Sequence, residues 1–291
     1  MLQQLINALS LGSTYALMAM GLAIIFSTMG VINFAHGELL TLGGYIMWVA
    51  LGSGVPWPAV LPITIAGTAV LAIVMERVAF RPLRGASMVT LLVTSFALSF
   101  FIQTVLGIVL GARAKAVDVP NWTSDVLRVG SVQLPVLQVA TTIVTVICLV
   151  ALAIFLRRSR MGIAMRAASD DLGMVRLLGI RASRVFGLAF ALSGMLAGIA
   201  ALLYVARSGS VQPDTGVAPL IKAFVAVIIG GVGSIGGAVV GGFVLGVLEV
   251  LLQANLPSGV RPMSDAFALI VLIAVLMARP SGILGRQGRF V

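Results

Sequence analysis

The chain has 291 residues, of which 60% are hydrophobic and 10% are charged, and its mean hydropathy is +1.14. Soluble domains carry about 25% charged residues, so this composition excludes an ordinary soluble protein. The net charge of +10 would suggest nucleic acid in a soluble protein, but here the arginines sit between apolar runs and set membrane topology instead. The apolar runs lack the alternation of a membrane barrel. The sequence therefore predicts an all-α, polytopic transmembrane helical bundle, with residues 1–291 forming a single transmembrane domain.

We expect about eight spans, roughly seven to nine, with broken or re-entrant helices among them. Full-length apolar segments are predicted at residues 5–29, 58–78, 89–110, 136–156 and 185–205. Shorter apolar pieces are predicted at residues 39–51, 223–229, 238–252 and 266–278. Between them, residues 111–135 form a polar segment that we expect to hold a short hairpin or a surface helix.

A polar break at residues 30–38 interrupts the first two apolar runs and holds Asn33, His36 and Glu38. Charged groups in hydrocarbon cost roughly 2.5–3.5 kcal/mol on insertion scales, so such a break lies at a membrane surface or lines a protected cavity. One interpretation makes these three residues a lining or gate of a substrate pathway, whose half-helix ends offer free backbone groups to a zwitterion. The other makes the break an ordinary turn with Asn33 as a helix N-cap. The residues alone leave both interpretations open.

The longest hydrophilic segment, residues 157–184, carries seven arginines and an apolar stripe with helical spacing. We interpret it as a pair of short amphipathic helices outside the membrane, interrupted or ended by Gly173 and Gly179. A loop that only sets topology and meets anionic lipid would not need this length, so docking of a cytoplasmic partner is favoured.

A glycine-rich stretch follows at residues 230–242. It fits either a broken helix whose bare backbone faces a cavity, or close packing of helices through small residues, and packing is slightly favoured. The candidates for a pathway lining are Gly230, Gly231, Gly233 and Ser234. Glu249 lies in the following apolar run; an intramembrane acid is a functional hypothesis by default, and Lys222 is a possible ion-pair partner.

The positive charges predict an orientation. Thirteen lie around residues 77–84, in 157–184 and in the tail, against five at Arg113, Lys115, Arg128, Arg207 and Arg261. This asymmetry places the C-terminus in the cytoplasm and the N-terminus outside. With one His and one Cys, the chain cannot build a His/Cys metal site, and no catalytic motif is present, so we expect neither an enzyme nor a metal site.

Several stretches carry a resemblance to a known family. Residues 30–38, 223–238 and 279–285 look like the signatures of the branched-chain amino acid ABC transporter permeases, specifically the shorter, H-type permease; permeases for urea and short amides are close relatives. Residues 165–171 and 177–180 are similar to the cytoplasmic coupling segment of that family. The motifs occur in the family's order and cover nearly the whole chain.

The resemblance implies a multi-pass permease subunit of the bacterial inner membrane that forms the pathway of a binding-protein-dependent importer. Its implied partners are a second permease, two cytoplasmic ATPases that bind the ATP, a periplasmic binding protein and membrane lipid, with no cofactor in this chain and no nucleic acid. The implied ATPase contacts are Arg166, Ala167, Ala168, Asp170, Asp171, Leu178 and Gly179. In the coupling pattern of ABC importers in general, Glu-Ala-Ala is followed by a Gly four residues later. Here Arg166 occupies the position of the Glu, and the glycine, Gly173, lies one position beyond that of the pattern.

Two rival classes remain. A stand-alone secondary transporter is disfavoured by the scarcity of intramembrane acids, and a channel by the docking segment. Within the importer class, urea or short amides are the alternative substrates to branched-chain or other amino acids.

Overall fold

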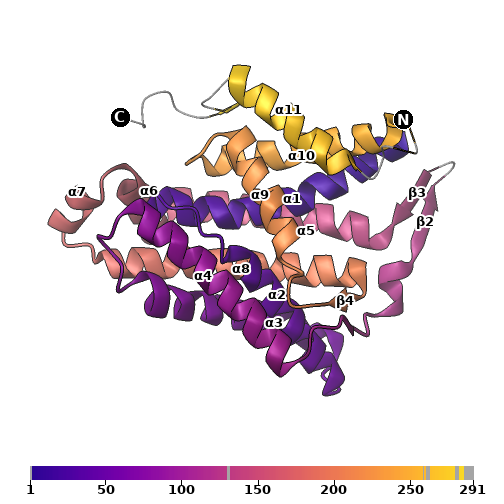
Figure 1. Ribbon diagram of the computed structural model, residues 1–291, viewed down its shortest axis with the longest axis horizontal. Helices are drawn as coiled ribbons and strands as arrows, with labels where there is room; N and C mark the ends of the chain where they lie inside the picture. The colour runs from indigo at the N-terminus through magenta and orange to yellow at the C-terminus, as the bar shows by residue number, and fades with distance from the viewer. Residues whose placement is uncertain (1, 130–131, 258, 260–262, 279–281, 285–291) are drawn as a thin grey trace.

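The computed structural model describes residues 2–129, 132–257, 259, 263–278 and 282–284. Within these ranges, six helices are long and apolar enough to cross a membrane. They are α1 (Leu2–Met29), α3 (Trp57–Met75, continued by the π-helical turn η1, Glu76–Phe80), α4 (Met88–Val109), α5 (Val136–Arg158), α8 (Ala182–Ser208) and α10 (Ile235–Asn255). Figure 1 shows them running side by side along the horizontal axis, as expected for a helical bundle in a membrane.

Three further apolar helices are shorter: α2 (His36–Gly52), α9 (Val217–Gly230) and α11 (Ser264–Ala278). At 17, 14 and 15 residues they rise only about 20–25 Å, which is less than the ~30 Å of a hydrocarbon core. They correspond to three of the four short pieces that the sequence predicted, although α9 begins six residues earlier than the expected 223. The prediction that residues 238–252 form a short piece was wrong, because α10 extends beyond both ends of that run to 21 residues.

The two ends of the bundle differ. One end, here the arginine-rich end, carries η1, α6 (Arg160–Asp170) and α7 (Leu172–Leu177); α6 and α7 are the expected pair of short helices. The other, the hairpin end, carries the antiparallel strands β2 (Val126–Val129) and β3 (Val132–Pro135), preceded by the 3₁₀ turn η2 (Asn121–Ser124). A second small sheet pairs β1 (Lys115–Ala116) with β4 (Ser210–Val211). The hairpin expected within 111–135 is thus confirmed, and the helical fold includes two small sheets.

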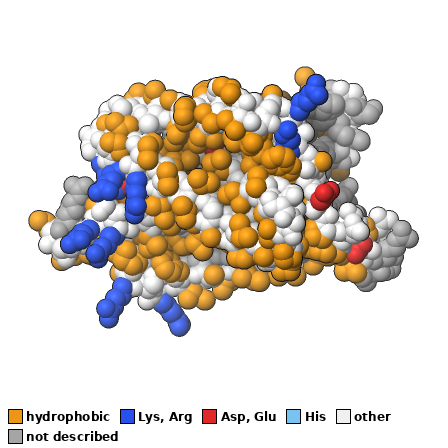
Figure 2. All heavy atoms as spheres, turned by 90° about the horizontal axis from the view of Figure 1, so that it is seen from below, with side chains coloured by type: hydrophobic (Ala, Val, Ile, Leu, Met, Phe, Trp, Pro, Cys, Tyr) orange, Lys and Arg blue, Asp and Glu red, His pale blue; other side chains and the backbone are white. Residues whose placement is uncertain are grey.

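Charged side chains gather at these ends. In Figure 2 a broad, mostly hydrophobic face lies between them, and Lys and Arg side chains cluster at its left, the arginine-rich end. The tail arginines 279, 286 and 289, and Arg261, lie outside the described residues. A hydrophobic face between charged ends is the distribution that a membrane imposes on a helical bundle.

Helix α2 begins inside the bundle rather than where α1 ends. A Cβ added to Gly21 would lie 2.8 Å from the ring of His36, the first residue of α2. Gly21 precedes the end of α1 by eight residues, or about 12 Å of helix rise. The chain therefore folds back along α1 after Met29, and α2 starts at the depth of Gly21 and of Ser193 in α8, whose hydroxyl lies 3.1 Å from His36 Nδ1.

Helix α9 begins at the same depth, against the start of α2. A Cβ on Gly37 would lie 2.6 Å from the carbonyl oxygen of Gly216, the residue before α9. The Gly216 N–H donates to Thr41 Oγ1 of α2 at 2.9 Å. The N-terminal ends of two half-length helices thus meet inside the bundle, and each helix runs from there to a different end.

Small residues hold the centre of the bundle together. Helix α1 packs lengthwise on α10, where a Cβ on Gly12 would lie 2.9 Å from Phe243 Cα and one on Gly242 would lie 2.5 Å from Ala16 N. Lipid gives no hydrophobic drive between helices, so such close backbone approach supplies the packing instead. The packing interpretation of the glycine-rich stretch holds for this part of α10.

The contact between Gly37 and Gly216 leaves no room for a side chain, so adding a single methyl group there should lower the stability of the protein strongly. Gly37→Ala should destabilise the protein by about 1–3 kcal/mol, because the added Cβ meets the backbone of Gly216 rather than a flexible side chain. The measurement is the thermal melting of detergent-solubilised protein, followed by size-exclusion chromatography. The matched control is Gly107→Ala in α4, where an added Cβ meets nothing within 4 Å. Equal melting temperatures of the two variants would contradict the packing described.

Candidate functional site

A cavity of about 740 Å³ lies at the arginine-rich end, between α1, α5, α6 and the loop that joins α9 to α10. Its wall is apolar along α1, α5 and α10 and polar where α6 and the loop approach each other. The residues that line it include Met20, Ser27, Leu149, Leu152, Ala153, Arg157, Met165, Arg166, Ser169, Gly233, Ser234 and Val239. It brings together two predicted pathway residues, Gly233 and Ser234, and the predicted coupling residue Arg166.

The loop, here called the glycine break (residues 231–234), owes its shape to backbone freedom. Gly231 and Gly233 have φ of +106° and +89°, a region that L side chains rarely adopt. Ser234 then caps α10, its hydroxyl accepting from the Gly237 N–H at 3.0 Å. The chain thereby reverses within four residues and leaves bare backbone at the cavity wall, so this stretch is both a helix break and a packing site.

The end of the chain completes the glycine break. The N–H groups of Ile283 and Leu284 donate to the carbonyls of Ile229 and Gly230 at 2.8 and 2.9 Å. These carbonyls belong to the last turn of α9, which has no partners within its own helix. Two of the stretches that resemble family signatures, 223–238 and 279–285, therefore contact each other, although residues 279–281 and 285 lie outside the described residues.

Helix α6 forms the wall of the cavity nearest the end of the bundle. Ser159 caps it by accepting from the Gly162 N–H at 2.9 Å, and a Cβ on Gly162 would lie 2.6 Å from Leu156 Cα of α5. Ala168 is buried against the bundle, whereas Met165, Arg166 and Ser169 line the cavity. Helix α6 contacts α1, α5 and α8, so a displacement of α6 would act on those helices and alter the width of the cavity that separates it from the glycine break.

The outer surface of α6 and α7, here the docking surface, exposes apolar side chains. Leu177 and Leu178 are 84% and 77% exposed, and Met174 is 60% exposed. Asp171 starts α7, its carboxylate accepting from the N–H groups of Gly173 and Met174 at 2.8 and 3.0 Å. Gly179, with φ of +78°, ends the segment. The break between the two helices thus lies at Asp171, and the expectation that Gly173 causes it was wrong because Gly173 lies in the first turn of α7.

The polar break does not line this cavity. Asn33, His36 and Glu38 are at most 1% exposed. Glu38 Oε1 accepts from Ser99 Oγ and Gln103 Nε2 of α4, both at 2.8 Å. Asn33 turns the chain into α2, its side-chain oxygen accepting from the Ala35 N–H at 3.0 Å. The break is thus a buried turn closed by the Asn33 side chain. The expectation that Asn33 is the helix N-cap was wrong, because Ala35 occupies that position and no side chain caps the first turn of α2.

Glu249 of α10 is 2% exposed and forms an ion pair with Lys222 of α9, the partner that the sequence suggested. Its second oxygen accepts from the hydroxyl of Tyr15 in α1. The pair joins three helices that all approach the glycine break, and the cost of burying the acid is offset by these contacts.

Comparison with known proteins identifies the family to which this chain belongs. A family model described as "Branched-chain amino acid transport system / permease component" matches residues 4–276. The chain belongs to this permease family. The expected family is confirmed, and the protein is a transport permease and not an enzyme.

Relatives match over nearly the full length. The permease is 36% identical over 297 residues to the high-affinity branched-chain amino acid transport system permease protein BraD of Pseudomonas aeruginosa, covering 98% of this chain and 96% of BraD. It is 37% identical over 300 residues to the corresponding protein LivH of Escherichia coli K12, with the same coverage. The ribose import permease protein RbsC of Escherichia coli is 27% identical over 300 residues, covering 95% of this chain and 85% of RbsC.

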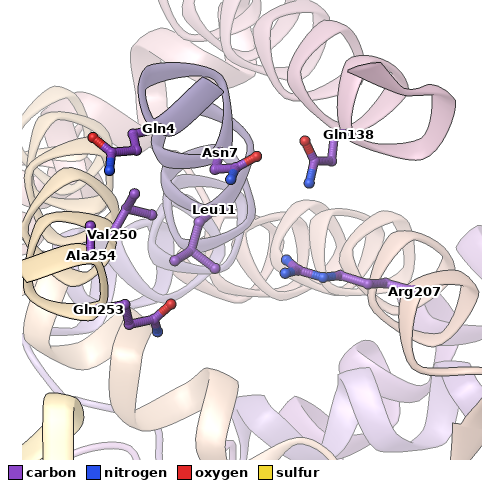
Figure 3. Close-up of a pocket in the computed structure, with 8 residues that line it drawn as sticks. All are labelled: Gln4, Asn7, Leu11, Gln138, Arg207, Val250, Gln253 and Ala254. Atoms are coloured by element: carbon purple, nitrogen blue, oxygen red, sulfur yellow. The ribbon is translucent and has the colours of Figure 1, made fainter. Parts of the chain in front are cut away.

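The permease has a second, polar pocket that the sequence analysis did not single out. It has a volume of about 290 Å³, lies at the hairpin end, and is lined by side chains of α1, α5, α8 and α10 (Figure 3). The polar residues are Gln4, Asn7, Gln138, Arg207 and Gln253. Each lies near the end of its span, where polar residues are ordinary, so only the tertiary fold distinguishes them. Among the residues that the structure describes, no cluster of three or more potential metal ligands is present.

The buried ion pair predicts a stability pattern for the permease. Glu249→Leu and Lys222→Met should each destabilise it by about 3–5 kcal/mol, since each leaves one buried charge without its ion-pair partner. The double variant Lys222→Met, Glu249→Leu should recover most of this loss. Thermal melting in detergent measures all three. A double variant as unstable as the sum of the single ones would mean that the pair does not interact.

Proposed function

We propose that this permease forms, with a second permease, the substrate pathway of an ATP-driven, binding-protein-dependent importer for branched-chain amino acids in a bacterial inner membrane. The observation that carries the proposal is the 740 Å³ cavity, which lies between α6 and the glycine break. BraD and LivH are permeases of branched-chain amino acid transport systems, which supports the substrate class.

Orientation follows from charge. The arginine-rich end faces the cytoplasm and the hairpin end the periplasm, by the excess of arginine at α6, α7 and η1. The chain then passes nine times between the two ends, counting six long spans and the three shorter helices of the described residues. With the arginine-rich end in the cytoplasm, an odd number of passes corresponds to an N-terminus outside and a C-terminus in the cytoplasm, and we propose this orientation for residues 1–291 as a single permease domain.

Energy reaches this chain from its partners. Two cytoplasmic ATPases bind the ATP, and this chain needs no cofactor of its own. We assign their contact to the docking surface within residues 157–184, whose exposed Leu177 and Leu178 are apolar groups outside the membrane-spanning helices. This surface adjoins five of the residues predicted to contact the ATPases: Arg166, Ala167, Ala168, Asp170 and Asp171.

The mechanism is a rocking of spans. Closure of the ATPases pushes on α6 and α7, α6 moves against the glycine break, and the contacts of Gly230, Gly231 and Ser234 with α10 and residues 283–284 change. The buried polar break, with Asn33, His36 and Glu38, and the Glu249 ion pair keep the half-length helices in register during this motion. The 740 Å³ cavity is the cytoplasmic exit, where substrate loses its last contacts.

Uptake of labelled leucine and labelled urea tests the function, in vesicles that hold the complete complex with its binding proteins, with and without ATP. We expect leucine uptake that requires ATP, because the chain has an exposed apolar docking surface for the ATPases and few intramembrane acids for ion coupling. Urea uptake alone would retain the importer and change the substrate. Uptake without ATP would favour a channel or secondary transporter.

A matched pair of variants tests the exit in the same assay. Ala153→Trp places a bulky ring at the wall of the 740 Å³ cavity, where it narrows the passage, and should abolish most leucine uptake. Ala151→Trp places the same side chain on the exposed face of α5, away from the cavity, and should transport normally. Equal uptake by the two variants would remove this cavity from the pathway.

Association with the ATPases tests the docking surface. Leu177→Asp should reduce the ATPase that co-purifies with the permease by about tenfold or more, since a charge replaces an apolar side chain at the contact. Leu127→Asp alters a leucine that is 53% exposed at the hairpin end and should leave the ATPase bound. Normal ATPase recovery with Leu177→Asp would contradict this assignment.

A further inference from the structure

The pocket of 290 Å³ at the hairpin end combines one cation, several carboxamides and an apolar wall. Figure 3 shows the Arg207 side chain reaching from α8 into the space enclosed by α1, α5 and α10, with Gln138 projecting from α5 above it. Asn7 of α1 and Gln253 of α10 lie on the facing helices. Four separate helices thus aim polar groups at one small volume.

Arg207 is the one ionised side chain among the residues that line the pocket. In the described part of the chain, no carboxylate forms an ion pair with it. A guanidinium offers a planar fork of N–H donors that matches a carboxylate, and it is the side chain best suited to bind one. The pocket also contains no acidic residue, so a ligand with net positive charge would find no partner.

Gln138 supplies the complementary group. Its Oε1 is buried and accepts no hydrogen bond within the described residues, which is unusual for a buried carbonyl oxygen. An oxygen of this kind is an acceptor for an ammonium group. Asn7 is held in place by Gln3, whose Nε2 donates to Asn7 Oδ1 at 3.2 Å.

The rest of the wall is aliphatic: Leu11, Val250 and Ala254. We propose that this pocket binds a free α-amino acid with an aliphatic side chain, its carboxylate on Arg207 and its ammonium on Gln138 Oε1. The inference rests on the proposed function and adds to it a first binding site for substrate on the permease itself, on the side where substrate arrives.

The pocket is closed at its inner end by contacts between helices, so a bound substrate would be held there. Just below Leu11, α1 and α10 touch through Gly12 and Gly246, so closely that a Cβ on Gly246 would lie 2.9 Å from the Ala8 carbonyl oxygen. Thr145 of α5 ties to α1 at the same depth, donating to the Ser13 carbonyl at 3.3 Å. Beyond this closure the same three helices line the 740 Å³ cavity. The two cavities therefore lie along the same interface of α1, α5 and α10, and the close contact between these helices separates one cavity from the other.

Binding and uptake by matched variants test the site, in the complete permease–ATPase complex. Binding of labelled leucine is measured without the binding protein and without nucleotide, with leucine and leucinamide as competitors. We expect leucine to compete and leucinamide, which lacks the carboxylate, to fail. Arg207→Gln should weaken leucine binding and slow ATP-driven uptake by at least about tenfold, the usual effect of losing a charged hydrogen bond. Arg207→Lys should restore part of both, and Gln138→Leu should weaken binding as well.

The control is Lys115→Gln, which removes a cation from the same end of the molecule but from outside the pocket, where its Nζ lies over Trp48. It should bind and transport like the wild type. Equal losses in Arg207→Gln and Lys115→Gln, or competition by leucinamide as strong as by leucine, would overturn the proposal. Uptake by the wild type without ATP would refute the proposed importer. The binding measurements would then still test whether the pocket binds leucine. Normal binding and uptake by Arg207→Gln would refute the pocket alone.

Discussion

The contact between Gly37 and Gly216 determines how this bundle is built. Two chain segments, one before α2 and one before α9, enter the interior without helical hydrogen bonds, and lipid offers no water to satisfy them. The structure solves this by bringing the two segments together, where Thr41 accepts from the Gly216 N–H and Asn33 accepts from the Ala35 N–H. Only residues without side chains allow the backbones to approach so closely, and the depth of both half-length helices follows from this contact.

From this centre, the two half-length helices lead to the two functional ends. Helix α9 runs to the glycine break and the larger cavity, whereas α2 runs toward the hairpin end. Because α9 is held by Lys222 to α10 and by residues 283–284 at its last carbonyls, it cannot shift alone. Helix α6 contacts α1, which packs on both α9 and α10. Under the proposed function, a push on α6 would therefore reach α9 and α10 through α1.

The sequence predicted the features that depend on local pattern. Apolar runs located the long spans, the arginine-rich segment located α6 and α7, and the lone acid in an apolar run identified Glu249 together with its partner Lys222. The sequence did not predict the depth of the polar break, because Asn33 closes a turn equally well at a surface or inside a bundle. It also gave no sign of the Arg207 pocket, since Gln4, Gln138, Arg207 and Gln253 are ordinary span-end residues that only the tertiary fold assembles.

The bond between residues 283–284 and the end of α9 has a consequence for how the protein is made. The carbonyls of Ile229 and Gly230 receive these partners from a part of the chain that is synthesised more than fifty residues later. During translation, α9 and the loop after it enter the bilayer with exposed carbonyls, and they reach their final geometry only when α11 has been inserted. The half-length helix α9 and the glycine break are therefore among the last parts of the bundle to be completed, because their closing hydrogen bonds come from the segment that follows α11.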